Sequence, residues 1–211
     1  MSKKQALTEF HRGSILAVAE RLFAEKGTER TTMDDIAREA EYSKATLYVY
    51  FQSKEEIINA ILLSGMLLLK KKIQEAIDSH TDWYQAYDAV CAAIVRFYDE
   101  NPTAYAAATG AMPVMQAGGE ETKGIPEIKR VNAEIDELMA NFLVRGAAEG
   151  AVRSQLPPVE TVLLFWSALA GIVRTADVRK KYIQETVGLS REEFLKHGYR
   201  LLLASLTKVG N

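Results

Sequence analysis

Hydrophobic residues recur at helical spacing along the chain, which predicts an all-α protein. The first predicted helix runs from Thr8 to Lys26, and Gly27 supplies its C-terminal stop. Its apolar stripe consists of Ile15, Val18, Ala19, Leu22 and Phe23. Met1–Ala6 carries Lys3 and Lys4 and is expected to be a frayed arm. A basic arm of this kind could instead reach a DNA minor groove.

Three further helix starts fall within the stretch Thr31–Glu56. Each has a serine or threonine N-cap. The predicted helices are Met33 to about Ala40 after Thr32, Lys44 to about Phe51 after Ser43, and a long one from Ser53, in a capping box with Glu56, to about Ser79. Two short helices that meet across a tight turn form a helix-turn-helix, whose second helix can enter a DNA major groove.

The second short helix has one buried and one unusual exposed face when its residues are projected at about 100° each. Leu47 and Phe51 mark the buried face. The opposite side is small and partly apolar, with phenols at its edges: Lys44, Ala45, Thr46, Tyr48, Val49 and Tyr50. Small side chains allow close approach to base edges, and hydroxyls or ammonium groups can bond phosphates. Alternatively, the two tyrosines pack against the first helix.

The stretch Thr31–Ile57, TTMDDIAREAEYSKATLYVYFQSKEEI, resembles the DNA-binding signature of the TetR family of bacterial transcriptional repressors. The resemblance is specific over roughly residues 8–60, and Ala45 departs from it because many members have glycine there. Together with the projection, it implies base contacts from Lys44, Ala45 and Val49, and phosphate contacts from Thr32, Thr46, Tyr48, Tyr50 and Lys54.

The rest of the chain is also predicted to be helical. The expected segments are Asp82–Asn101, a helix from Pro102 towards Met112, a loop over residues 115–126, and helices over Pro126–Glu149, Val159–Tyr182 and Arg191–Lys208. We expect a helix-turn-helix DNA-binding domain at 1–53, joined by the long helix to a helical effector-binding and dimerisation domain at 54–211. Gly65, inside the long helix, marks either a close helix crossing or a bend.

The last two predicted helices, Val159–Tyr182 and Arg191–Lys208, are apolar on more than one face. A helix of this kind must cover a second surface. We therefore expect the two helices to pack against their copies in a homodimer. The alternative is a helix pair buried within one monomer.

Composition limits the possible functions. A net charge of −2 excludes a protein coated in basic residues, so contact with nucleic acid must come from a local patch. The single cysteine, Cys91, excludes an intramolecular disulfide framework and suits the cytoplasm. We expect no signal peptide and no transmembrane span, with the apolar stretches Ile61–Leu69 and Val162–Val173 as buried helices.

No catalytic, metal or cofactor site is expected. The three histidines, His11, His80 and His197, are far apart in sequence and lack metal-ligand spacing. An enzyme, or a structural module that has acquired a helix-turn-helix, is the alternative from another class.

The family resemblance implies a ligand cavity in the helical domain. Large adaptable side chains could line it, although each could equally be core. The candidates are Met66, Tyr87, Phe97, Tyr98, Tyr105, Met112, Phe142 and Trp166. The predicted function is therefore a ligand-responsive repressor that a small apolar or amphipathic effector releases from its operator. In the alternative, the C-terminal domain senses a protein partner or a redox state.

Overall fold

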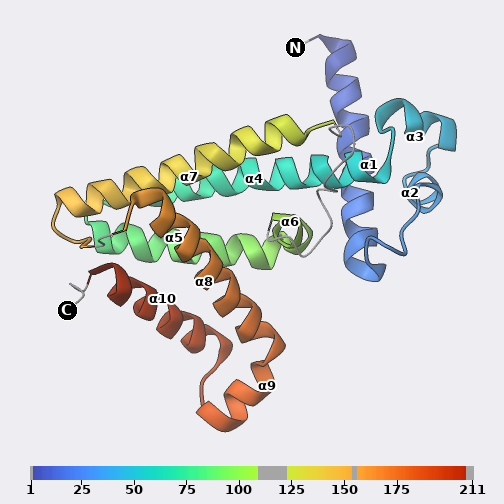
Figure 1. The fold of residues 1–211 in the computed structure, drawn as a ribbon. Helices are drawn as coiled ribbons and strands as arrows, with labels where there is room; N and C mark the ends of the chain where they lie inside the picture. The colour runs from blue at the N-terminus through green and yellow to red at the C-terminus, as the bar shows by residue number, and fades with distance from the viewer. Residues whose placement is uncertain (1, 109–122, 154–155, 208–211) are drawn as a thin grey trace. The chain divides into compact units, whose positions relative to one another are not determined.

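The computed structural model describes residues 2–108, 123–153 and 156–207, and for 106–108 only the backbone. All regular elements in these ranges are helical, which confirms the all-α prediction (Figure 1). They are α1 (Lys3–Lys26), α2 (Met33–Glu39), α3 (Lys44–Tyr50), α4 (Lys54–Asp78), α5 (Trp83–Glu100), α6 (Pro102–Ala108), α7 (Ile125–Ala148), α8 (Pro158–Val178), α9 (Lys180–Tyr182), a π-helix η1 (Ile183–Val187) and α10 (Arg191–Thr207). The predicted loop at 115–126, up to residue 122, and Lys208 lie outside the described residues.

The predicted N-caps position the short helices. The Thr32 hydroxyl accepts a hydrogen bond from the Asp35 N–H, and the Asp35 carboxylate accepts one from the Thr32 N–H, which closes a capping box. Ser43 caps α3 in the expected way. Ser53 caps α4, but its predicted box with Glu56 is wrong in one bond. The Glu56 carboxylate accepts from the N–H of Gln52, one residue earlier than expected.

The expectation of a frayed arm at Met1–Ala6 is also wrong. Helix α1 begins at Lys3, because the Ser2 hydroxyl accepts a hydrogen bond from the Gln5 N–H while the Gln5 side chain accepts from the Ser2 N–H. These two bonds satisfy backbone groups that would otherwise favour fraying. The first helix therefore begins more than a turn before the predicted start at Thr8.

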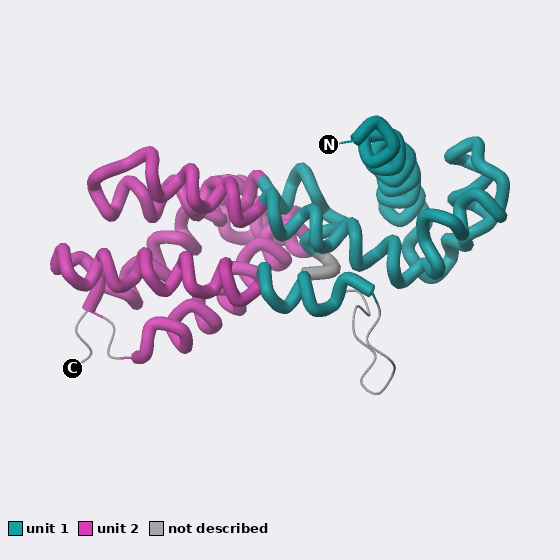
Figure 2. Tube along the Cα trace, turned by 90° about the horizontal axis from the view of Figure 1, so that it is seen from above, with its two compact units in different colours: residues 1–68, 97–131 teal, residues 69–96, 132–211 magenta. Residues whose placement is uncertain are grey.

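The chain forms two compact units (Figure 2): unit 1 consists of residues 1–68 and 97–131, and unit 2 of 69–96 and 132–211. In unit 1, α1, α2 and α3 enclose a small core of Ile15, Ala19, Phe23, Ile36, Leu47 and Phe51, all buried. The Arg12 guanidinium lies 4.0 Å from the centre of the Phe51 ring.

The first part of α4 packs against α6 at Gly65, where an added Cβ would overlap Ala104. Of the two alternatives for Gly65, the close helix crossing is confirmed.

Unit 2 is organised around Trp83 at the start of α5. Its indole stacks on the ring of Phe142 at a centroid distance of 5.0 Å and donates a hydrogen bond to the Phe142 carbonyl at 2.9 Å. Gly146 permits this approach, because a Cβ there would lie 2.5 Å from the indole nitrogen. Helix α8 packs against α10, where Gly198 makes room for Ile172.

Helix α8 corrects two expectations. The predicted helix Val159–Tyr182 is interrupted: α8 ends at Val178, Arg179 leaves the helical conformation, and α9 and η1 continue to Val187. The second correction concerns how much of this apolar helix is buried. Among the described helices, α8 is long and apolar enough to cross a membrane, with mean hydropathy 1.4, and only 33% of that window is buried. The stretch Val162–Val173 is thus not the fully buried segment expected.

Candidate DNA-binding face and effector cavity

Helix α3 is held in unit 1 by its buried side. Leu47 and Phe51 are fully buried against α1 and α2. The turn between α2 and α3 is closed by Glu41, a non-glycine residue in the left-handed region at φ 60°. The outer side of α3 therefore points away from the core. Ala45 is exposed there, and Val49 has 76% of its surface exposed.

Lys44, the charged residue of α3, is paired with a carboxylate in this structure. The Lys44 ammonium lies 2.8 Å from the Asp34 carboxylate on α2, and both side chains are exposed. The hydrogen bond and charge of Asp34 raise the pKa of Lys44, so the ammonium stays charged at neutral pH. An exposed pair of this kind contributes little to stability. Lys44 can therefore leave Asp34 for a base edge or a phosphate at small cost.

The two tyrosines of α3 differ. Tyr48 is exposed at the edge of the outer face. Tyr50 is half-buried and packs against the rings of His11 and Tyr42, at centroid distances of 5.6 and 6.4 Å. The His11 Nδ1 lies 2.6 Å from the Tyr42 hydroxyl. For Tyr50, packing against the first helix is thus observed. Tyr42 and His11 were not predicted here, since they meet only when α1 packs on the turn.

The three remaining predicted phosphate ligands make local hydrogen bonds. Thr32 serves the N-cap of α2, and the Thr46 hydroxyl lies 2.8 Å from that of Ser43. The Lys54 ammonium donates to the Thr28 carbonyl at 2.8 Å. A lysine ammonium has three donors, so Lys54 keeps capacity for a phosphate oxygen while it holds this bond. The Lys44–Asp34 pair places the start of α3 beside α2, and the Lys54–Thr28 bond places the start of α4 beside the segment that precedes α2.

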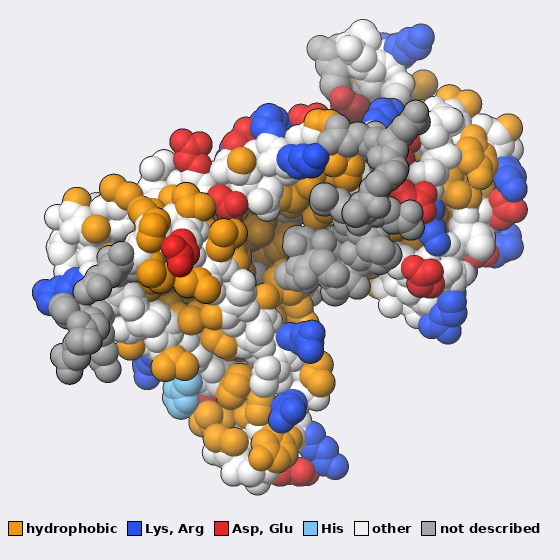
Figure 3. All heavy atoms as spheres, viewed as in Figure 1, with side chains coloured by type: hydrophobic (Ala, Val, Ile, Leu, Met, Phe, Trp, Pro, Cys, Tyr) orange, Lys and Arg blue, Asp and Glu red, His pale blue; other side chains and the backbone are white. Residues whose placement is uncertain are grey.

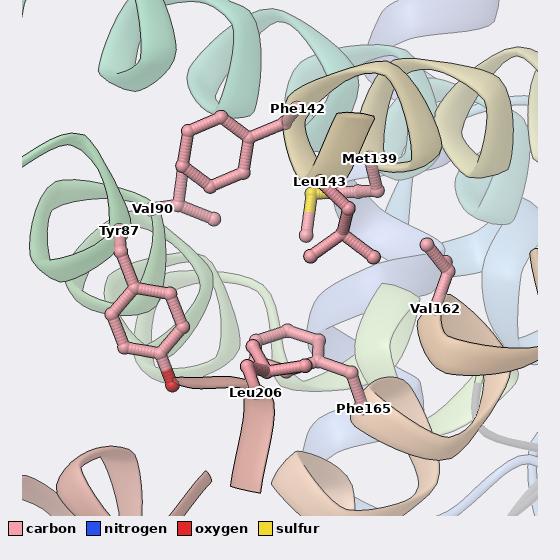
Figure 4. Close-up of a pocket in the computed structure, with 8 residues that line it drawn as sticks. All are labelled: Tyr87, Val90, Met139, Phe142, Leu143, Val162, Phe165 and Leu206. Atoms are coloured by element: carbon pink, nitrogen blue, oxygen red, sulfur yellow. The ribbon is translucent and has the colours of Figure 1, made fainter. Parts of the chain in front are cut away.

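Unit 2 contains a small apolar cavity, which Figure 4 shows with its lining side chains. They come from α5, α7, α8 and α10 and are Tyr87, Val90, Met139, Phe142, Leu143, Val162, Phe165 and Leu206. Its volume is about 10 Å³, which is room for about one water molecule. The lining is hydrocarbon, one thioether and one phenol. Such a wall suits an apolar or amphipathic molecule once the side chains move apart.

Two of the eight predicted pocket residues, Tyr87 and Phe142, line this cavity. Trp166 is half-buried in unit 2 beside Phe165 and does not line it. Four others lie in unit 1, where Met66 and Phe97 are core and the rings of Tyr98 and Tyr105 meet edge to face at 4.5 Å. Met112 lies outside the described residues. Sequence reasoning missed Met139, Phe165 and Leu206, because their spacing is that of any core helix.

Tyr87 connects the cavity to α10. Its ring lies 6.2 Å from that of Phe165, and its hydroxyl donates a hydrogen bond to the Tyr199 carbonyl at 2.9 Å. Burial raises the pKa of Tyr87 above its ordinary value, so the phenol remains a neutral donor. The neighbouring Cys91 thiol is fully buried, and burial raises its pKa to about 12.

Within the described ranges, no group of three His, Cys, Asp or Glu side chains could hold a metal ion.

The comparisons with known proteins point to regulation. The family model described as "Bacterial regulatory proteins, tetR family" matches residues 15–61, which hold the second half of α1, all of α2 and α3, and the start of α4. The chain belongs to the TetR family.

This TetR-family chain is 28% identical over 182 residues to the transcriptional repressor KstR2 of Rhodococcus jostii, covering 82% of this chain and 87% of that protein. PfmR of Thermus thermophilus shares the fold with a TM-score of 0.69 at 24% identity, covering 92% and 99% of the two chains. AibR, solved with isovaleryl coenzyme A and operator DNA, gives a TM-score of 0.67 at 18% identity, covering 92% and 98%. The chain is a helix-turn-helix transcriptional regulator of this family.

Proposed function

We propose that this regulator is a homodimeric repressor that leaves its operator when a small apolar or amphipathic molecule enters unit 2. The observation that carries the DNA-binding part is the outer face of α3. It combines Ala45 and the largely exposed Val49 with the exposed ammonium of Lys44, and it is anchored from behind by Leu47 and Phe51. A small, weakly charged face on a rigid helix fits a major groove, where methyl groups meet thymine methyls.

In this proposal each DNA-facing residue has one of two roles. Lys44, Ala45 and Val49 contact base edges. Tyr48 and Lys54 bond phosphates, with Thr32 and Thr46 at the helix starts beside them. Tyr50 contributes less than the others, since its ring packs against His11 and Tyr42. The proposed DNA-binding domain is 1–53, and a protein that regulates chromosomal DNA acts in the cytoplasm.

The proposed dimer forms through α8 and α10. Leu163 and Leu164 on α8 have 53% and 54% of their surface exposed, and Leu201 on α10 has 71%. Figure 3 shows hydrophobic side chains lying open over this part of unit 2. A second copy placed against them would bury these leucines and explain why α8 is so apolar. A dimer would also present two α3 helices to half-sites about 34–36 Å apart.

The proposed effector enters the unit 2 cavity. AibR was solved with isovaleryl coenzyme A and operator DNA, and it supports this class of molecule as a proposal for the present chain. At about 10 Å³ the cavity is closed, so an effector must displace Phe165, Met139 or Tyr87. Moving Tyr87 breaks its bond to the Tyr199 carbonyl and so reaches α10. Typical coupling of about 1–3 kcal/mol would weaken DNA binding roughly 5–150-fold.

Substitutions on α3 test this function. A duplex selected from a random library by the purified protein serves as probe, and fluorescence anisotropy measures affinity at several salt concentrations. Lys44→Ala should change which bases are preferred at one position, with a cost of about 1–3 kcal/mol on the best sequence. Tyr48→Phe should weaken binding to all DNA sequences by a similar factor, because it removes only a phosphate bond.

Lys71→Ala is the matched control, because Lys71 is exposed on α4 and pairs with Glu75 four residues along. It should leave both affinity and base preference unchanged. If Lys44→Ala and Tyr48→Phe behaved like Lys71→Ala, α3 would not be the DNA-reading helix. The same probe then reports the effector: release by an apolar ligand supports the proposal, and a ligand that binds unit 2 with no loss of DNA affinity contradicts it.

A further inference from the structure

Unit 1 contains a second cavity, separate from the DNA-facing side of α3. It has a volume of about 90 Å³ and lies where α1, α4 and α6 meet. Its apolar walls include Leu16, Ile61 and Ala104, and its polar groups are Glu20, Ser64 and Asn101. Two of its lining residues, Ser64 and Leu68, are exposed.

Glu20 is the unusual group in this cavity. It is half-buried, and no described residue gives it a hydrogen bond or an ion pair, whereas most carboxylates of α1 and α2 have one. Burial alone raises its pKa above the ordinary value. The stretch 109–122 contains no lysine or arginine in its sequence that could serve as a partner. A partly desolvated carboxylate without a cation is costly to keep charged.

We propose that this cavity binds a small organic cation, a short primary alkylammonium, with Glu20 as its counter-ion. The alkyl chain would lie against Leu16, Ile61 and Ala104. A primary ammonium has three N–H donors. The Glu20 carboxylate, the Ser64 hydroxyl and the Asn101 amide oxygen are the acceptors that the cavity supplies for them.

The chemistry of the lining favours an organic cation over a metal ion. One carboxylate and two neutral oxygens fall short of the six to eight oxygens that Ca²⁺ takes, and the apolar walls would strip water from a Mg²⁺ ion without replacing it. An alkylammonium needs only one charged partner and gains from the apolar walls. It also touches α1, α4 and α6 together, so its binding stabilises their packing.

The experiment uses the full-length protein and n-propylammonium chloride, with sodium chloride at equal ionic strength as reference. Isothermal titration should show saturable binding with a dissociation constant on the order of 1 mM, as expected for a ligand of about four heavy atoms. Glu20→Gln keeps the size of the side chain and removes its charge, so it should weaken binding at least tenfold. Glu9→Gln, an exposed carboxylate on the same helix, is the matched control and should bind like the parent.

Two further measurements complete the test. 1-Propanol has the same length and no charge, so it should bind at least tenfold more weakly than propylammonium. A crystal soaked in propylammonium should show its nitrogen within hydrogen-bond distance of a Glu20 carboxylate oxygen. Equal binding by Glu20→Gln, equal binding of propanol, or an empty cavity in the soaked crystal would each overturn the proposal.

Discussion

Gly65 lies where α4 crosses α6 in unit 1, and replacing it by alanine tests how tightly the two helices are packed. A Cβ built at this position would overlap the Cβ of Ala104 and lie 3.4 Å from the Cζ of Phe97. The Ala104 Cβ is fixed to its backbone and cannot rotate away. The helices must therefore separate by about 1 Å to restore a normal carbon–carbon contact of roughly 3.5 Å.

Two effects of opposite sign decide the outcome. Alanine improves the intrinsic stability of a helix interior by about 1 kcal/mol over glycine. Inserting a methyl group into a packed interface costs about 1–3 kcal/mol. The overlap with backbone-fixed atoms places the cost in the upper part of that range. Gly65→Ala should thus lower the free energy of unfolding by about 1 kcal/mol and the Tm by about 2–4 °C.

Thermal unfolding by circular dichroism at one fixed protomer concentration measures this change. Gly13→Ala in α1 is the matched control, because a Cβ there meets nothing within 4 Å. That variant should gain up to about 1 kcal/mol from helix propensity alone. In an Ala104→Gly background the clash is absent, so Gly65→Ala should then stabilise as Gly13→Ala does, which gives a coupling energy of about 2 kcal/mol. If Gly65→Ala stabilised the parent as much as Gly13→Ala does, the crossing would impose no constraint.

The remaining predictions concern the proposed dimer, the DNA-binding domain and the cysteine. Leu201→Glu should convert the proposed dimer into a folded monomer, as measured by sedimentation at micromolar concentration. The control Leu7→Glu, at an exposed position of α1, should remain dimeric. A monomeric parent protein would contradict the proposed interface. The Lys26 ammonium, together with Thr32, holds the pKa of Asp35 well below its ordinary 3.8. The ionised Asp35 carboxylate therefore stabilises the folded protein fully above pH 3.8, and this contribution is lost as the pH falls. The Tm deficit of Asp35→Asn should accordingly shrink from pH 7 to pH 3, and a constant deficit would rule out the charge effect. Burial raises the pKa of Cys91 to about 12, so very little of its thiol is ionised at pH 8. Cys91 should therefore react with iodoacetamide on the order of 10³-fold more slowly than free cysteine. Rapid reaction in the folded protein would favour redox sensing instead.

Local signals explain why so much of the fold is predictable. The caps at Thr32 and Ser43 specify where α2 and α3 begin, and the helix period alone places Leu47 inside and Val49 outside. Glycine with a positive φ follows α1 and α7 at Gly27 and Gly150, as expected. The early start of α1 was also visible in principle, since Ser2 and Gln5 have the spacing of a capping box.

What could not be predicted depends on contacts between distant segments. Nothing near Tyr50 in sequence indicates that its ring would meet His11 from α1. The same holds for the effector cavity, where Phe165 and Leu206 come from helices whose apolar periodicity is shared by every core position. The break after Val178 is another case, because no proline or glycine marks it and the chain leaves the helix only at Arg179. Periodicity identifies buried faces but not the partners of those faces.

The closed state of the unit 2 cavity has a kinetic consequence. With room for about one water molecule, the cavity must open before any effector can enter. In stopped-flow mixing, the observed binding rate should therefore rise with effector concentration and level off at the opening rate of the protein. Effectors of different affinity would share that plateau and differ in how slowly they leave. The duration of derepression after an effector disappears from the medium would then be set by its residence time in this cavity.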